Sequence, residues 1–195
     1  MSYSQSYVPA ESPHPLFSES VEASAPWYVL TGGPCAGKTT TINELAKRGH
    51  PVLAEPARLI IDEKLAAGMT IDQIVTDPDW LPSVVRRARA QEALLPKDQL
   101  YFLDRAVPDS VAYYHHFKRE LDAEILSALK VCEYRKVFLL DLIDFRNDEA
   151  RHEDLEEAAI LHQLIRAAYE GKGFEVVNVP VMEVEKRADF ILARL

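Results

Sequence analysis

Short apolar runs alternate along the chain with longer stretches in which apolar residues recur every three or four positions. The runs predict buried strands, and the stretches predict amphipathic helices. The predicted strands span residues 27–31, 51–54, 100–104, 136–142 and 174–179, and the predicted helices span residues 40–47, 57–67, 71–75, 83–95, 108–117, 122–130, 155–169 and 183–195. This alternation predicts an α/β fold, in which helices cover both faces of a parallel sheet.

Length and composition are those of an ordinary globular domain. The chain has 195 residues, of which 48% are hydrophobic and 27% are charged, which is enough to bury the core of one domain. No apolar run approaches the length of a membrane span. The formal net charge of −9 argues against a nucleic-acid partner, which would require a basic surface.

The cysteines and the N-terminal residues indicate the compartment. Cys35 and Cys132 are too few for a disulfide framework or a zinc pattern, and Cys35 in a glycine-rich loop suits a reducing environment. The first lysine or arginine is Lys38, so neither a secretory signal nor a transit peptide is expected. Residues 1–26 are rich in Ser and Pro, and we expect a flexible tail outside a domain of residues 27–195. We therefore expect a cytoplasmic protein without a membrane partner.

A glycine-rich segment after the first predicted strand follows the phosphate-loop pattern G-x-x-x-x-G-K-[ST] without departure. Its residues, with the threonine that follows, are Gly32, Gly33, Pro34, Cys35, Ala36, Gly37, Lys38, Thr39 and Thr40. Glycines let the backbone wrap around a phosphate, and the N-terminus of the next helix directs N–H groups at the anion. A chance glycine turn would not require a strand before it and a helix after it, so the segment predicts nucleotide binding.

Two side chains of this loop have expected roles. Lys38 should reach the β- and γ-phosphates of a nucleoside triphosphate, and the Thr39 hydroxyl should bind Mg²⁺. Cys35 lies near a helix N-terminus, which favours its thiolate, although a small residue at an unconstrained loop position is the simpler explanation.

Asp104 ends an apolar run and is followed by Arg105. An Asp at the end of such a strand is typical of the residue that holds Mg²⁺ in phosphate-loop enzymes. Arg105 would then lie near a phosphate or an acceptor. The alternative is that Asp104 caps the following helix or pairs with a surface arginine.

Glu55 and Pro56 follow the second predicted strand. The carboxyl ends of parallel strands share one edge of a sheet, where ligands bind, so Glu55, Asp104 and the phosphate loop should meet at one cleft. Glu55 could accept a proton from an acceptor hydroxyl or orient the acceptor. Arg58 could bind an anionic group of the acceptor. Alternatively, Pro56 starts a helix and Glu55 lies near its positive end.

Residues 144–154 are rich in charge and predict a mobile loop after the fourth strand. Arg146 or Arg151 could close over the phosphates and neutralise charge in the transition state. The alternative is a solvated charged loop whose ions contribute little.

Arg86, Arg87 and Arg89 lie on one predicted helix with Gln91. The simpler interpretation is a solvated face on which Arg89 and Glu92 form an ordinary ion pair. A Gln91 that reads a base is the alternative.

The arrangement resembles small phosphate-loop kinases of the nucleoside and nucleotide kinase group. The likeness is carried by residues 32–39, Glu55-Pro56, Asp104-Arg105 and Asp109-Ser110-Val111-Ala112-Tyr113. Thymidylate kinases have a similar Asp-Arg followed by a Ser and an Ala-Tyr. Deoxynucleoside kinases have a similar Glu-Pro, in which the Glu activates the 5′-hydroxyl.

The chain is more similar still to a family of small NTPases under an AAA heading, related to the ribosylnicotinamide kinase part of NadR proteins. The shared pattern comprises residues 31–40, a Glu and an Arg near Glu55 and Arg58, Asp104-Arg105 with Asp109-Ser110, an Arg-bearing loop like that of Arg146, and a motif like residues 169–177. The likeness covers about residues 27–195. It implies a three-layer α/β/α fold with a five-stranded sheet ordered 2-3-1-4-5, and it does not imply a hexameric motor.

Departures from the relatives leave the acceptor open. Ala57-Arg58 follow Glu55-Pro56 where thymidylate kinases have glycines, and the tryptophan of deoxynucleoside kinases is missing there. Asp104 stands where deoxynucleoside kinases often have Glu, and Ala106 stands where Gly, Ser or an aromatic residue is commoner. The general site therefore transfers, but the acceptor specificity does not.

We expect an ATP- and Mg²⁺-dependent phosphotransferase that acts on a small acceptor, a nucleoside or a nucleotide. The expected site residues are Lys38, Glu55, Asp104, Arg105 and Arg146 for catalysis, Thr39 and Asp104 for Mg²⁺, and Glu55, Arg58, Arg105 and Asp109 for the acceptor. The absence of a guanine-reading Asn/Thr-Lys-x-Asp stretch favours ATP over GTP. The alternative is a nucleotide-dependent switch that hydrolyses ATP or GTP and acts on a protein partner. The oligomeric state is open, and a homodimer is compatible with the sequence.

Overall fold

The computed structural model describes residues 25–143 and 152–195. The strands are β1 (Trp27–Thr31), β2 (Val52–Leu53), β3 (Tyr101–Asp104), β4 (Lys136–Leu140) and β5 (Val176–Val179). The helices are α1 (Lys38–Lys47), α2 (Pro56–Ala66), α3 (Ile71–Val75), α4 (Trp80–Glu92), α5 (Val107–His116), α6 (Ala123–Leu129), α7 (His152–Glu170) and α8 (Val184–Leu192). Most of the expected tail and of the expected lid, including Arg146 and Arg151, lies outside the described residues.

The strands form one parallel sheet in the order β2-β3-β1-β4-β5, which confirms the expected topology. In this register Leu30 lies opposite Asp104 on β3, and Thr31 lies opposite Leu139 on β4. The loop that follows Thr31 therefore emerges between the carboxyl ends of β3 and β4, where a parallel sheet binds its ligands.

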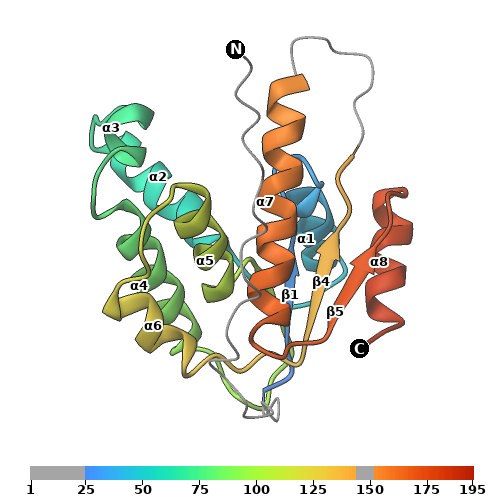
Figure 1. Cartoon of the computed structure of the whole chain (residues 1–195). Coiled ribbons are helices and arrows are strands. Elements are labelled where there is room, and N and C mark those ends of the chain that lie inside the picture. Colours follow the sequence, from blue (N-terminus) through green and yellow to red (C-terminus); the bar gives the residue numbers. More distant parts are fainter. Residues whose placement is uncertain (1–24, 144–151) are drawn as a thin grey trace.

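Alternate residues of the central strand face opposite helical layers, as the pleat of a strand requires. Trp27 and Val29 pack in a core with residues of α2 to α7, whereas Tyr28 and Leu30 pack with residues of α1 and α8. Figure 1 shows the sheet between these two groups of helices. The three-layer α/β/α fold is thus confirmed. Ala25, which sequence analysis assigns to the tail, is already buried in the first core.

Helix α4 begins at Trp80, three residues before the expected start at Ser83. Pro82 falls in the first turn of the helix, where its missing N–H costs nothing. Trp80 and Leu81 are buried, and their burial stabilises this extra turn.

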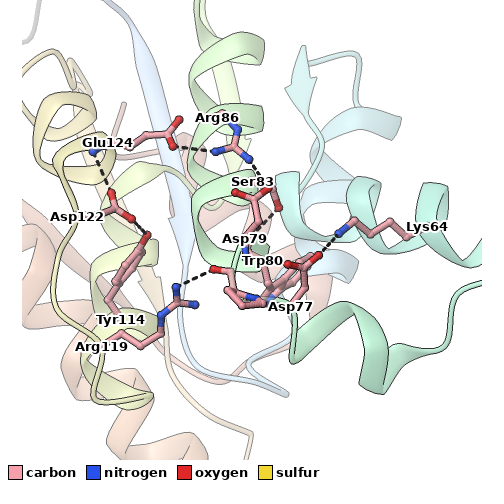
Figure 2. Close-up of polar contacts among 11 residues, drawn as sticks. Lys64, Asp77, Asp79, Trp80, Ser83, Arg86, Tyr114, Arg119, Asp122 and Glu124 are labelled. Atoms are coloured by element: carbon pink, nitrogen blue, oxygen red, sulfur yellow. Dashed lines mark hydrogen bonds and ion pairs between the residues drawn. The ribbon is translucent and has the colours of Figure 1, made fainter.

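Polar contacts hold the turn that precedes α4, as Figure 2 shows. Lys64 of α2 pairs with Asp77 at 3.3 Å, and the Arg119 guanidinium donates a hydrogen bond to the Pro78 carbonyl at 2.8 Å. These contacts come from opposite sides of the turn, so they fix the position of Trp80.

Among the helices that the structure describes, none is both long and apolar enough to cross a membrane.

Candidate active site

The phosphate loop adopts backbone conformations that few residues tolerate. Gly32, Cys35 and Gly37 have positive φ angles of 144°, 58° and 76°. A Cβ atom at Gly32 would lie 2.6 Å from the carbonyl oxygen of Leu140, so the close approach of β4 requires glycine there. The loop then turns into α1, which begins at Lys38.

Lys38 is buried and lies across the start of its own loop. Its ammonium donates hydrogen bonds to the carbonyl oxygens of Gly32 at 3.1 Å and Gly33 at 2.8 Å. Burial and the nearby Arg105 lower the Lys38 pKa to about 7, against the opposite effect of three carboxylates. A phosphate next to this ammonium would favour its charged form.

Asp104 has the features of a cation ligand. Its side chain is 5% exposed, and its Oδ1 atom is buried without a hydrogen-bond partner among the described residues. Burial and the neighbouring Glu55 raise the pKa of Asp104 to about 6. A buried carboxylate oxygen that lacks a donor is stabilised by a metal ion.

The donor set fits Mg²⁺ rather than a metal held by protein alone. Within residues 25–143 and 152–195, no three His, Cys, Asp or Glu side chains cluster as metal ligands. Mg²⁺ commonly takes one or two protein oxygens and completes its shell with phosphate oxygens and water. Asp104 and the exposed Thr39 at the start of α1 could supply such oxygens.

Arg105 directly follows β3 and contacts residues at the carboxyl ends of β1 and β2. Its backbone has a φ of 63°, and its N–H donates to the Leu30 carbonyl at 3.0 Å. Its guanidinium donates to Glu55 at 3.0 Å and to Asp109 at 2.7 Å. Burial opposes the charge, but Tyr113, Asp109 and Glu55 raise the Arg105 pKa overall. The structure therefore brings Glu55 and Arg105 together, as the sequence predicts.

Asp109 has both carboxylate oxygens engaged by protein donors. Oδ1 accepts hydrogen bonds from Thr31 at 2.6 Å and from Arg105 at 2.7 Å. Oδ2 accepts from the Ala106 N–H at 3.1 Å and from the Tyr169 hydroxyl at 2.6 Å. This geometry lets Asp109 hold Arg105 in place, and the predicted role of Asp109 in acceptor binding stays a prediction.

A cavity of about 270 Å³ opens beside Glu55 and Arg105, between α2, α4 and α5. Most of its wall is apolar, including Ile61, Val75, Trp80, Leu81, Tyr113 and Phe117. The polar residues on its wall are Glu55, Arg105, Asp109 and Ser110. An apolar cavity with a few convergent polar groups is typical of a small-molecule site.

Arg58 is not brought to this cavity. Its side chain is 70% exposed and pairs with Asp62, one turn later on α2, at 3.1 Å. It does not line the cavity, so the structure lends no support to the predicted role in acceptor binding.

The basic residues of α4 are all paired with carboxylates. Arg86 contacts Asp79 and Glu124 (Figure 2), Arg87 contacts Glu63, and Arg89 contacts Glu92. The expected Arg89–Glu92 pair is thus confirmed, but its face is not fully solvated, because Glu92 is buried. Gln91 donates to the Ala54 carbonyl at 3.2 Å, and its buried Oε1 atom lacks a partner among the described residues. A base-reading role for Gln91 stays a prediction.

Two residues that carry no sequence signal contact the phosphate loop. Arg187 of α8 is 2% exposed and donates to the Ala36 carbonyl at 2.8 Å, and burial lowers its pKa. His162 of α7 accepts a hydrogen bond at Nδ1 from the Gly33 N–H at 3.3 Å, and burial lowers its pKa too. Only the fold brings these residues to a loop more than 120 positions earlier, as the separations of 151 and 129 residues show.

Comparison with protein families places most of the chain in one family. Residues 27–187 match the AAA_28 family, described as an AAA domain. The chain belongs to this AAA-domain family. No curated protein matches the chain.

Solved structures place the AAA-domain chain among phosphate-loop kinases by fold. Thymidylate kinase from Ehrlichia chaffeensis is 11% identical, with a TM-score of 0.61, over 88% of this chain and 98% of that chain. NadR protein in complex with NR is 16% identical, with a TM-score of 0.64, over 87% of this chain and 50% of that chain. Deoxyadenosine kinase from M. mycoides with bound dATP is 12% identical, with a TM-score of 0.56, over 86% of this chain and 98% of that chain. The chain thus spans about half of the NadR chain, and these likenesses concern the fold alone.

Proposed function

We propose that this protein is an ATP- and Mg²⁺-dependent phosphotransferase that acts on a small molecule, a nucleoside or a nucleotide. The observation that carries the proposal is the acceptor-sized cavity beside Glu55 and Arg105. Arg105 directly follows Asp104, which lies opposite Leu30 just before the phosphate loop. One edge of the sheet therefore offers a triphosphate site and a second, apolar site next to it.

The chain's own residues account for each requirement of phosphoryl transfer. Loop N–H groups and Lys38 would hold the triphosphate, and Thr39 and Asp104 would hold Mg²⁺, which supplies charge neutralisation at the phosphates when bound. An acceptor hydroxyl in the cavity would attack the γ-phosphorus as the bond to the β–γ bridging oxygen breaks and ADP leaves. Glu55 would take the hydroxyl proton, and Arg105, which donates to Glu55 at 3.0 Å, would hold that carboxylate in position for the acceptor.

The names of the structurally similar proteins, and the ligands bound in one of them, support this proposal. Thymidylate kinase and deoxyadenosine kinase phosphorylate small molecules by name, and a second NadR structure holds NAD and AMP-PNP. The nucleotide-dependent switch is less well supported, because such a switch needs no apolar cavity for a second small molecule.

The test is ATP consumption by the purified protein with Mg²⁺, alone and with a panel of nucleosides, nucleoside monophosphates and nicotinamide riboside. We expect strong stimulation by one acceptor and a phosphorylated product detected by mass. Slow ATP loss that no acceptor stimulates would contradict the proposal and favour the switch.

A further inference from the structure

We infer that the acceptor is an uncharged or cationic compound that presents a hydroxyl to Glu55, a nucleoside rather than a nucleoside monophosphate. This inference rests on the proposed phosphotransferase function and names its acceptor class. It follows from the charges around the cavity and from how each of them is already paired.

The cavity wall is poor in positive charge. Among its described lining residues, Arg105 is the one lysine or arginine, and it pairs with the two carboxylates of Glu55 and Asp109. Burial raises the pKa of Tyr113 on the same wall, so this phenol stays neutral. A phosphate monoester carries nearly two negative charges at pH 7, and bringing it to this wall would place like charges together.

The charge of Arg105 is already balanced by two carboxylates. Its Nε and one terminal nitrogen donate to Glu55 and Asp109, and its guanidinium carbon lies 5.6 Å from the centre of the Tyr113 ring. A phosphate that took over this guanidinium would leave Asp109, which is buried, without its ionic partner. An unpaired buried carboxylate is strongly destabilising.

The cations on the neighbouring helices are also committed elsewhere. Arg58 is exposed and pairs with Asp62. Arg86 pairs with Asp79 and Glu124, on contacts drawn in Figure 2. Neither Arg58 nor Arg86 lines the cavity, so neither is placed to bind a phosphate there.

The rest of the wall suits a flat ring. Trp80, Tyr113 and Phe117 supply aromatic surface, and Ser110 supplies a neutral hydroxyl. A volume of about 270 Å³ lies just below the usual range of ligand pockets, so it suits a small ligand. Glu55 is partly exposed beside this space, so it could receive a hydroxyl proton from a ligand whose ring occupies the apolar part.

The experiment compares matched pairs on the full chain saturated with AMP-PNP and Mg²⁺. Each pair is a nucleoside and its 5′-monophosphate, with nicotinamide riboside and its monophosphate as a cationic pair, and binding is measured by calorimetry. We expect at least one nucleoside to bind about tenfold or more tightly than its monophosphate. A monophosphate that binds as well or better, or failure of every nucleoside to bind, would overturn the inference.

Two further measurements follow: one separates this inference from the proposed function, and the other tests the charge argument. Turnover with ATP tells them apart, because efficient phosphorylation of a monophosphate would sustain the phosphotransferase and overturn only the acceptor class. Glu55→Gln removes one negative charge from the wall while keeping a hydrogen-bonding group. The ratio of the affinity for a nucleoside to the affinity for its monophosphate should therefore fall by about threefold or more. An unchanged preference would overturn the charge argument, and Asp62→Asn, outside the cavity, is the matched control.

Discussion

The Arg105 guanidinium donates a hydrogen bond to the Asp109 carboxylate at 2.7 Å, across a single turn of chain. The same carboxylate also accepts from Thr31 of β1 and Tyr169 of α7. Asp109 of α5 therefore joins β1, α7 and the Arg105 side chain in one buried unit. Two sequence motifs, Asp104-Arg105 and Asp109-Ser110, each supply one residue of this unit: Arg105 and Asp109.

Replacing Asp109 should destabilise the fold. Asp109→Asn would remove one of the two ionic partners of the buried Arg105 guanidinium, and breaking a buried pair costs about 3 kcal/mol. Urea unfolding of the variant measures this change. Asp62→Asn breaks a pair on the surface of α2 and should leave the unfolding midpoint nearly unchanged. An equal effect of the two substitutions would show that Asp109 does not hold Arg105 as described.

Arg105 should matter for the acceptor, and Arg58 should not. Lysine at position 105 cannot donate to Glu55 and Asp109 in the fork geometry of a guanidinium, so Arg105→Lys should lower kcat/KM for the acceptor by about tenfold or more. Arg58→Lys should change it by less than about twofold, because Arg58 lies outside the cavity. Steady-state kinetics on both variants checks this, and a larger loss in Arg58→Lys would reverse the assignment.

Nucleotide binding should take up a proton at mildly alkaline pH. The Lys38 pKa is lowered to about 7 in the nucleotide-free protein, and an adjacent triphosphate raises it. Above pH 7 Lys38 is then largely neutral before binding and protonated after it, so affinity should fall as pH rises through this range. Calorimetry at pH 8 in two buffers of different ionisation enthalpy measures the uptake.

Lys38→Arg is the control for this proton uptake. A guanidinium stays charged throughout the range, so the heat of AMP-PNP binding should become independent of the buffer. Equal heats in both buffers for the unchanged protein would contradict the depressed Lys38 pKa.

Arg187 should contribute to triphosphate affinity from the back of the loop. Its guanidinium donates to the Ala36 carbonyl, and its buried Nε lacks a partner among the described residues, so this buried charge gains most when an anion is bound. Arg187→Met should weaken AMP-PNP binding by roughly tenfold, the effect of a charged hydrogen bond of about 1.5 kcal/mol. Binding calorimetry measures this.

Arg48→Met is matched to that substitution, because Arg48 also ties α1 to α8, through Asp189 at 2.6 Å. It lies at the far end of α1 from the phosphate loop. If α8 acted only by packing, both variants would lose affinity alike, and that result would refute a direct effect of the Arg187 charge.

The sequence predicts those parts of the site that are set by local pattern. The phosphate loop lies between a strand and a helix, and parallel strands necessarily bring Glu55 and Asp104 to the same edge. Pattern cannot give contacts that depend on helix orientation. Arg58 follows Glu55 closely in sequence, yet its position on α2 directs it to solvent.

The sequence pattern also cannot predict contacts between residues that lie far apart in the chain. Arg187 and His162 reach the phosphate loop from α8 and α7, and neither lies in a motif that points there. The sequence pattern places the start of α4 too late, because Pro82 suggests a breaker, whereas the burial of Trp80 favours helix there. The acceptor class that we infer likewise depends on which charges the fold pairs.

We propose that the γ-phosphoryl group passes to a small organic acceptor bound beside Glu55. The most direct test follows the label from γ-labelled ATP, with Mg²⁺ and a low-molecular-weight cell extract, in the unchanged protein and in Lys38→Ala. We expect the label to appear in an organic phosphate ester, and we expect Lys38→Ala to slow this transfer by about 10²-fold or more while remaining folded. Label found only in inorganic phosphate, or near-normal transfer by folded Lys38→Ala, would contradict it.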